Sequence, residues 1–352
     1  MVTGIVCEFN PMHGGHKHLI KSVKQDEKDA VICCMSGNFV QRGEFAVADK
    51  FKRAETALQN GADLIIELPA VYSTLSAEGF CRAGVRLIEA TKAADRIAFG
   101  AENAEIEKLA EIAEKLKDKS VQKQIAAEMK SGISFPAARS RVMNTALLDY
   151  PNNILAVEYL KAATLPCFAV KRIGMGHDSD DELYSSSAIR QRMNKNEICS
   201  IYHCETAVLS RLRMMTAEDF KQIADVSEGL ENRIAEAVKK ACSLDALYSL
   251  VKSKRYTLSR IRRIVLRAYL GITDTPENPP YIRVLGFNSK GRELLSKIKK
   301  NADLPIITKL SDCTQSTRPF FEQECKFTDL YNLGYKKPLP CATEQQSQIV
   351  II

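Results

Sequence analysis

Short apolar runs and segments with helical spacing alternate through the first hundred residues. The apolar runs predict four strands, at residues 2–7, 29–35, 62–69 and 95–100. Between them, residues 16–25, 47–61 and 76–90 carry apolar side chains at helical spacing, and Gly61 is suited to close the second helix. This strand–helix rhythm predicts βαβ units and a parallel sheet, so we expect an α/β, Rossmann-like fold.

Three unusual loops follow predicted strands directly, at residues 8–16, 36–44 and 100–103. In a parallel sheet the carboxyl ends of the strands meet at one edge, and ligands bind beyond that edge. We therefore expect these loops to form one site.

The pattern changes after residue 103. Residues 104–163 look helical and predict an insertion, and a further strand is expected near residues 165–174. Beyond about residue 200 the chain is mostly helical, with short strand-like pieces after Pro279. We divide the chain into an α/β domain over residues 1–195, with a helical insertion at about 104–163, and a mostly helical region over residues 196–352.

Composition fits an ordinary globular protein, with 45% apolar and 26% charged residues among 352. No secretory leader and no apolar run of eighteen residues is present, so no membrane segment is expected. The 11 cysteines include no CxxC pair, which argues against a zinc ribbon and favours free thiols in the cytoplasm.

Positive charge is concentrated in residues 252–267 (KSKRYTLSRIRRIVLR), which hold seven basic residues and no acidic one. This stretch predicts contact with an anionic partner such as RNA, with Tyr256 and Tyr269 available for base stacking. The alternative is an ordinary amphipathic helix, since Ile261 and Val265 lie on an apolar face.

Three of the five histidines lie within residues 13–18, in the sequence HGGHKH. His13 and His16 stand between a predicted strand and a predicted helix, where glycines permit close backbone approach and the helix N-terminus attracts phosphate. The two imidazoles can stabilise negative charge on an attacked phosphate. The alternatives are a metal site with His18 as third ligand, or incidental loop histidines.

A second motif, SSSAIR at residues 185–190, stands at the start of another predicted helix. Its serines offer N-cap acceptors and hydroxyl donors, and Arg190 brings a fixed positive charge. A plain helix cap with a solvent-facing arginine is the alternative.

The HxGH pattern and the serine motif together resemble the HIGH-type nucleotidylyltransferase superfamily. The opening GIVCEFNPMHGGHKHLI, with FGAEN, PNNILAVEYLKA, KRIGMGHDS and SSSAIR, is more specifically similar to the bacterial tRNA(Met) cytidine acetate ligase family, over roughly residues 1–192. The sequence departs from the family pattern in two places. Gly14 stands where Asn is usual, and residues 185–188 read Ser-Ser-Ser-Ala where the family has a sequence nearer Ser-Ala-Thr-Ala.

The resemblance implies a nucleotidylyltransferase domain that activates acetate as acetyl-adenylate. It would use ATP with Mg²⁺, and elongator tRNA(Met) would be the acetyl acceptor. The product would be N4-acetylcytidine at the wobble position, with AMP and pyrophosphate released. His13 and His16 would be catalytic, with no protein-bound metal. The implied ATP-binding residues are Val6, Cys7, Glu8, Phe9, Asn10, Pro11, Met12, Gly14, Gly15, Lys17, His18, Leu19, Gly100, Asn152, Asn153, Arg172, Ser186, Ser187 and Arg190.

Two further groups are expected at the other substrates. Acetate or the target cytidine would contact Ser36, Gly37, Asn38, Gln41 and Arg42. The tRNA would contact Lys252, Lys254, Arg255, Arg260, Arg262, Arg263 and Arg267, while Lys50, Lys52 and Arg53 face either RNA or solvent. Two other functions remain open, a small-molecule adenylyltransferase of the same superfamily and an inactive RNA-binding protein. The sequence leaves the oligomeric state open.

Overall fold

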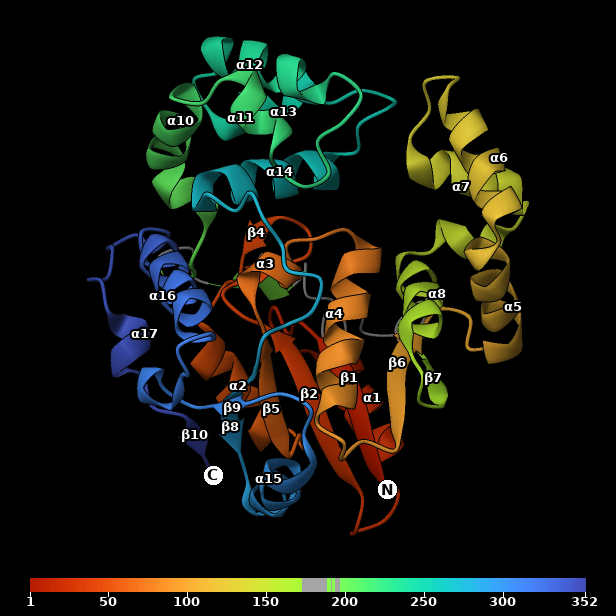
Figure 1. Ribbon diagram of the computed structural model, residues 1–352, viewed down its shortest axis with the longest axis vertical. Helices are drawn as coiled ribbons and strands as arrows, with labels where there is room; N and C mark the ends of the chain where they lie inside the picture. Colours follow the sequence, from red (N-terminus) through yellow and green to blue (C-terminus); the bar gives the residue numbers. More distant parts are fainter. Residues whose placement is uncertain (173–188, 191, 194–196) are drawn as a thin grey trace.

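A twisted sheet forms the centre of the computed structural model, which describes residues 1–172, 189–190, 192–193 and 197–352 (Figure 1). Its main path runs β10-β8-β5-β2-β1-β6-β7. Five of these strands are mutually parallel, namely β1 (Val2–Cys7), β2 (Ala30–Ser36), β5 (Leu64–Leu68), β6 (Arg96–Ala101) and β7 (Cys167–Lys171). The predicted α/β fold with a parallel sheet is confirmed.

Helices cover both faces of the sheet, which explains why its strands read as continuous apolar runs. On β1, Ile5 and Cys7 pack toward α1 (Gly14–Val23) and α2 (Lys50–Gln59). Val6 points the other way, into the core beneath α4 (Ala77–Ala90). The approach on that side is close, because a Cβ on Gly84 would lie 2.6 Å from Val6 Cγ1. The short helix α3 (Ala70–Ser73) precedes α4.

The last part of the chain returns to this sheet. Strand β8 (Ile282–Phe287) pairs antiparallel with β5, and β9 (Ile306–Ile307) and β10 (Val350–Ile351) both pair parallel with β8. Sequence patterns marked strand-like pieces here without placing them in the sheet. The structure adds them to the sheet of the first domain, where β8 pairs with the backbone groups at the edge of β5.

The insertion and the segment after residue 200 form two groups of helices: the first flanks the sheet beside β6 and β7 and extends past its carboxyl edge, and the second lies beyond that edge (Figure 1). The insertion consists of α5 (Ile106–Lys117), α6 (Lys119–Met129), α7 (Phe135–Met143), the 3₁₀ helix η1 (Ala146–Asp149) and α8 (Pro151–Ala162). The second group consists of η3 (Ile201–Cys204), α10 (Glu205–Arg213), α11 (Ala217–Lys221), α12 (Leu230–Lys240), α13 (Leu244–Val251) and α14 (Leu258–Leu270).

The remaining elements lie at the β8 side of the sheet, except for a short hairpin at the carboxyl edge that packs against α14. They are the hairpin of β3 (Phe39–Val40) and β4 (Glu44–Phe45), α15 (Ser289–Asn301), η4 (Leu310–Asp312), α16 (Arg318–Asn332) and α17 (Thr343–Gln346). No helix in the described part of the chain is long and apolar enough to cross a membrane.

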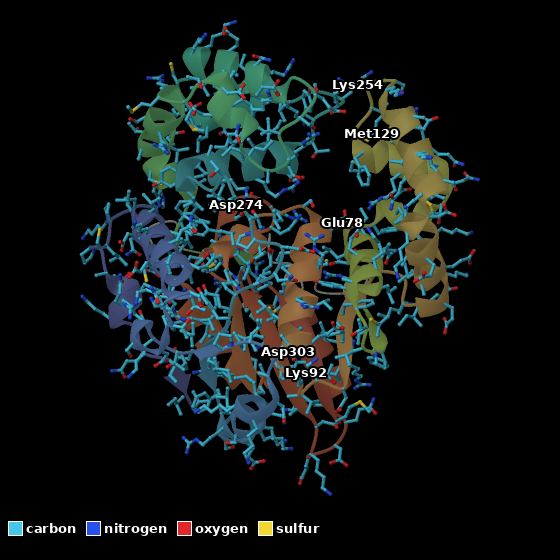
Figure 2. All side chains as sticks on the ribbon, viewed as in Figure 1. Glu78, Lys92, Met129, Lys254, Asp274 and Asp303 are labelled. Atoms are coloured by element: carbon cyan, nitrogen blue, oxygen red, sulfur yellow. The ribbon has the colours of Figure 1, made fainter. Side chains whose placement is uncertain are left out.

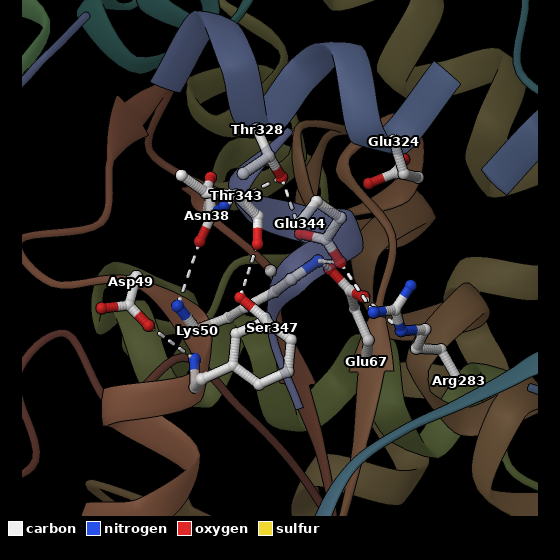
Figure 3. A network of polar contacts seen from close by, with 12 residues as sticks. Asn38, Asp49, Lys50, Glu67, Arg283, Glu324, Thr328, Thr343, Glu344 and Ser347 are labelled. Carbon is white, nitrogen blue, oxygen red and sulfur yellow. Dashed lines mark hydrogen bonds and ion pairs between the residues drawn. The ribbon is translucent and has the colours of Figure 1, made fainter. Parts of the chain in front are cut away.

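A buried network of charges ties the C-terminal segment to the sheet (Figure 3). Lys50 Nζ lies 2.7 Å from Glu67 Oε1 and 2.9 Å from Glu344 Oε1, and Arg283 lies 2.7 Å from the same Glu344 atom. The side chain of Lys50 is 2% exposed, so it holds the fold together rather than facing RNA or solvent. The same correction applies to Arg53, whose guanidinium is buried and donates to main-chain carbonyls of residues 8 and 36.

Candidate active site

A cavity of about 1050 Å³ opens at the carboxyl edge of the sheet. Its floor comes from the ends of β1, β6 and β7 and from the start of α1, its sides from α4 and the insertion, and its roof from α14. Glu78 of α4 and Met129 of α6 are two of its lining residues and lie on the insertion side of the molecule (Figure 2). The loops after the strands therefore meet at one edge, as predicted.

His13 and His16 form a reciprocal cap at the start of α1. His13 is the N-cap residue, and its Nδ1 accepts the Gly15 N–H at 3.1 Å. His16 Nδ1 in turn accepts the His13 N–H at 3.3 Å. Two backbone donors of the first turn are thus satisfied by imidazoles, as serine and glutamate do in an ordinary capping box. The His16 and Lys17 N–H groups donate to the His13 carbonyl at 2.9 and 3.1 Å, so the turn offers an anion its helix-dipole charge and the imidazole Nε2–H groups.

These hydrogen bonds determine which ring nitrogen carries the proton. Because Nδ1 of each ring accepts a backbone N–H, the hydrogen of each neutral imidazole lies on Nε2. Burial lowers the pKa of His13 to about 4 and holds that of His16 well below its usual value, with Arg172 adding to both effects. Near neutral pH both rings are therefore uncharged Nε2–H donors beside the helix N-terminus.

Two arginines bring positive charge to the same cavity. Arg190 donates to the Asn10 carbonyl at 2.6 Å, and Arg172 donates to Asn152 Oδ1 at 3.3 Å. Both line the cavity with His13. Arg190 belongs to the serine motif, whose Ser186 and Ser187 lie outside the described residues. A polyphosphate at the α1 N-terminus would meet both guanidinium groups.

The start of α8 lies beside the end of β6. Glu102, just after β6, accepts the main-chain N–H groups of Asn152 and Asn153 at 3.3 and 2.9 Å. Gly100 and Asn152 line the cavity, whereas Asn153 is fully buried and bonds the Asn103 N–H and the Leu147 carbonyl. Asn153 therefore positions this turn and is not exposed to a nucleotide, which corrects the expectation for it.

The other residues predicted to bind ATP divide into two sets. Those that line the cavity are Val6, Cys7, Glu8, Phe9, Asn10, Gly15, His18 and Leu19. The other set belongs to the same loop and first turn but does not line the cavity, and consists of Pro11, Met12, Gly14 and Lys17. Phe9 supports the site directly, because its ring meets that of His16 edge-on at 5.1 Å.

The segment expected to hold acetate or the target base is split in two. Gln41 and Arg42 line the cavity. Ser36 and Gly37 instead lie below it, where their carbonyls accept from Arg53, and Asn38 accepts the Lys50 N–H through Oδ1. For these three the structure corrects the expectation of substrate contact, since the end of β2 is covered by α2.

The basic stretch also divides by exposure. Arg255, Arg260 and Arg263 line the cavity roof, and Lys252 and Lys254 are exposed before α14. Arg262 pairs with Glu44 across to the β3–β4 hairpin.

Two residues of this stretch and Tyr269 just after it are internal, which corrects the RNA contacts expected of them. Arg267 is 1% exposed and donates to the Val71 carbonyl at 2.9 Å. Tyr256 and Tyr269 are 7% and 5% exposed, too buried for a base to stack on.

Sequence reasoning missed one wall of the cavity. Phe135 and Arg139 of α7 line it, with the Arg139 guanidinium 5.6 Å from the Phe135 ring and 3.5 Å from Glu158. No local motif marks these residues, because they meet the strand ends only through the folded insertion.

No group of three or more histidine, cysteine, aspartate or glutamate side chains among the described residues could hold a metal ion.

Comparison with known proteins agrees with this geometry. The chain matches the HIGH Nucleotidyl Transferase family over residues 1–208 and 194–347. It is 38% identical to the tRNA(Met) cytidine acetate ligase of Thermoanaerobacter sp. (strain X514), covering 95% of this chain and 96% of the relative. The ligase of Acetivibrio thermocellus is 35% identical, with 96% of each chain covered.

A solved structure has the same fold. Thermotoga maritima TmcAL bound with alpha-thio ATP superposes with a TM-score of 0.89 at 30% identity, covering 100% of this chain and 99% of that chain. With the histidine cap, the arginines and the match along nearly the whole length, this chain belongs to the tRNA(Met) cytidine acetate ligase family of HIGH nucleotidyl transferases.

Proposed function

We infer that this protein is an ATP-dependent acetate ligase that acetylates the wobble cytidine of elongator tRNA(Met). Acetate and ATP form acetyl-adenylate and pyrophosphate, and the acetyl group then passes to the exocyclic N4 amine, giving N4-acetylcytidine and AMP. The family membership supports the reaction. The observation that carries it in this chain is the pair of neutral imidazole donors at the N-terminus of α1.

The first step needs positioning and charge neutralisation more than a covalent nucleophile. An acetate oxygen attacks the α-phosphorus of ATP, the bond to the β-phosphate oxygen breaks, and pyrophosphate leaves. The Nε2–H groups of His13 and His16, beside the positive end of the α1 dipole, donate to the phosphate oxygens as charge develops. Arg172 and Arg190 would hold the polyphosphate, and a Mg²⁺ ion bound to the nucleotide would supply further charge neutralisation.

The roof of the cavity suits the second substrate. Arg255 and Arg260 line it, and the exposed Lys252 and Lys254 extend positive charge outward from it. Phosphates of the anticodon arm can bind these groups while one unpaired base enters the cavity. This function places the enzyme in the cytoplasm with its tRNA.

The test is pyrophosphate release from ATP with and without acetate and bulk bacterial tRNA, followed by nucleoside analysis of the RNA. Acetate-dependent release with acetylcytidine in the digest is the expected result. Pyrophosphate release that does not depend on acetate, with the adenylate transferred to another acceptor, would indicate a small-molecule adenylyltransferase. No release with tRNA binding retained would indicate an inactive RNA-binding protein.

A further inference from the structure

The transfer step must dispose of a proton. When the N4 lone pair attacks the acetyl carbonyl carbon, a C–N bond forms and the bond from that carbon to the adenylate oxygen breaks. AMP leaves with the electron pair, and the nitrogen must lose one proton to become a neutral amide. The exocyclic amine of cytosine is a weak nucleophile, so a positioned proton acceptor would speed this step.

Neither histidine of the cap can accept that proton. Nδ1 of His13 and Nδ1 of His16 each accept a backbone N–H, and their Nε2 atoms carry hydrogen. A neutral imidazole in this state has no lone pair left for a proton. The acceptor must therefore be sought among the other groups that line the cavity.

Four carboxylates of the cavity lining are paired with cationic side chains. The pairs are Glu44 with Arg262, Glu78 with Lys161, Glu158 with Arg139 and Lys161, and Asp225 with Arg263. A carboxylate in an ion pair is a weaker proton acceptor, because its charged form is already stabilised.

Glu8 differs from these four. It follows β1 directly, and its main-chain carbonyl is held by Arg53 at 2.6 Å. Its Oε1 accepts the Gln41 N–H at 2.6 Å, which orients the carboxylate beside Gln41 and Arg42. Among the described residues, no side chain donates a hydrogen bond to Glu8, and Oε2 accepts none.

We propose that Glu8 is the general base of acetyl transfer, accepting the N4 proton on its carboxylate as the C–N bond forms. This role rests on the proposed function. The proton passes afterwards to water, and the carboxylate is restored for the next turnover. The negative charge of Glu8 repels the phosphates of ATP and so weakens nucleotide binding. A role as proton acceptor explains why a carboxylate is nevertheless present in this cavity.

The surroundings of Glu8 suit this role. Burial raises its pKa, and nearby Glu44 acts in the same direction, while the Gln41 N–H, Arg53 and Arg42 oppose them. A carboxylate with a raised pKa is a stronger base than an ordinary glutamate.

Glu8→Gln is a sharp test, because an amide oxygen can still accept the Gln41 N–H. Two rates are compared, acetate-dependent ATP–pyrophosphate exchange and single-turnover acetyl transfer to an anticodon stem-loop RNA. We expect exchange to change by less than about threefold and transfer to fall about 100-fold or more. The wild-type transfer rate should rise with pH as Glu8 ionises, and the variant should lack this rise. Glu55→Gln, an exposed carboxylate on α2 outside the cavity lining, serves as the matched control and should transfer normally.

Three outcomes would overturn the proposal. If the Glu8→Gln variant transferred acetyl at the wild-type rate, the adenylate phosphate and not Glu8 would be the proton acceptor. Loss of exchange and transfer together, or a raised KM for ATP in exchange, would make Glu8 a nucleotide-binding or structural residue. Loss of the pH-dependent rise in His18→Gln but not in Glu8→Gln would assign the role to His18. Failure of the wild-type enzyme to exchange at all would instead contradict the proposed function.

Discussion

The imidazole of His13 stacks on that of His16, with ring centroids 3.7 Å apart and planes inclined by 25°. Each ring also accepts a backbone N–H from the turn they cap. Protonating either ring would place a positive charge against its neighbour and break a cap hydrogen bond. The pair is therefore locked as two neutral donors aimed from the helix N-terminus, which is what charge development on a phosphate requires.

His16→Ala should abolish adenylate formation while leaving tRNA binding intact. The variant loses one donor to the α-phosphate and the acceptor for the His13 N–H, and removal of one such donor costs about 100-fold or more in rate. Acetate-dependent ATP–pyrophosphate exchange measures the first effect and filter binding of tRNA the second. Lys21→Ala, in the last turn of α1, is the control. Equal loss of exchange and binding would contradict the separation of the two sites.

The depressed pKa of His13, about 4, predicts an acid-sensitive fold. Between its folded value and the ordinary 6.5 the unfolded chain binds more protons, so the free energy of unfolding falls as pH falls through this range. His13→Asn keeps an N-cap acceptor and removes the titration. Relative to this variant, the wild type should lose about 2 kcal/mol between pH 7 and pH 4, with allowance for partial screening. Urea denaturation across this range measures it, and parallel curves for the two proteins would refute it.

Lys50→Met should destabilise the fold strongly without touching the cavity. The change leaves Glu67 and Glu344 buried with one cation fewer, and breaking a buried pair in this way costs about 3–5 kcal/mol. Urea denaturation gives the free energy of unfolding. Lys52→Met, exposed on the same helix, should stay within about 0.5 kcal/mol of the wild type. Adding Glu344→Gln to Lys50→Met should recover part of the loss, and no recovery would mean that the charge imbalance is not its cause.

The exposed lysines before α14 should contribute to tRNA affinity through phosphate contacts. The double variant Lys252→Ala/Lys254→Ala removes two such contacts, so the slope of log affinity against log salt should become shallower by roughly 1.5. Titrations of tRNA at several salt concentrations measure the slope. Lys299→Ala/Lys300→Ala removes the same charge from the end of α15 and should leave the slope unchanged. The same change of slope in both variants would indicate a general charge effect instead of a local binding surface.

Features that depend only on neighbours along the chain can be predicted from the sequence. The alternation of apolar runs with helical spacing predicts the parallel sheet, because buried strands and amphipathic helices each have a local period. The histidine turn is local as well. A strand, two glycines and a helix start place His13 and His16 at an anion-binding terminus whatever surrounds them.

Which polar side chains face the cavity could not be predicted locally, because it depends on the packing of distant segments. Lys50, Arg53 and Arg267 look like surface cations in sequence, yet each is buried by segments distant along the chain. The cavity wall formed by Phe135 and the pairing of β8 with the sheet also could not be predicted, because they join segments distant along the chain. Burial of a charge depends on long-range packing and on finding a partner, and no local period encodes either.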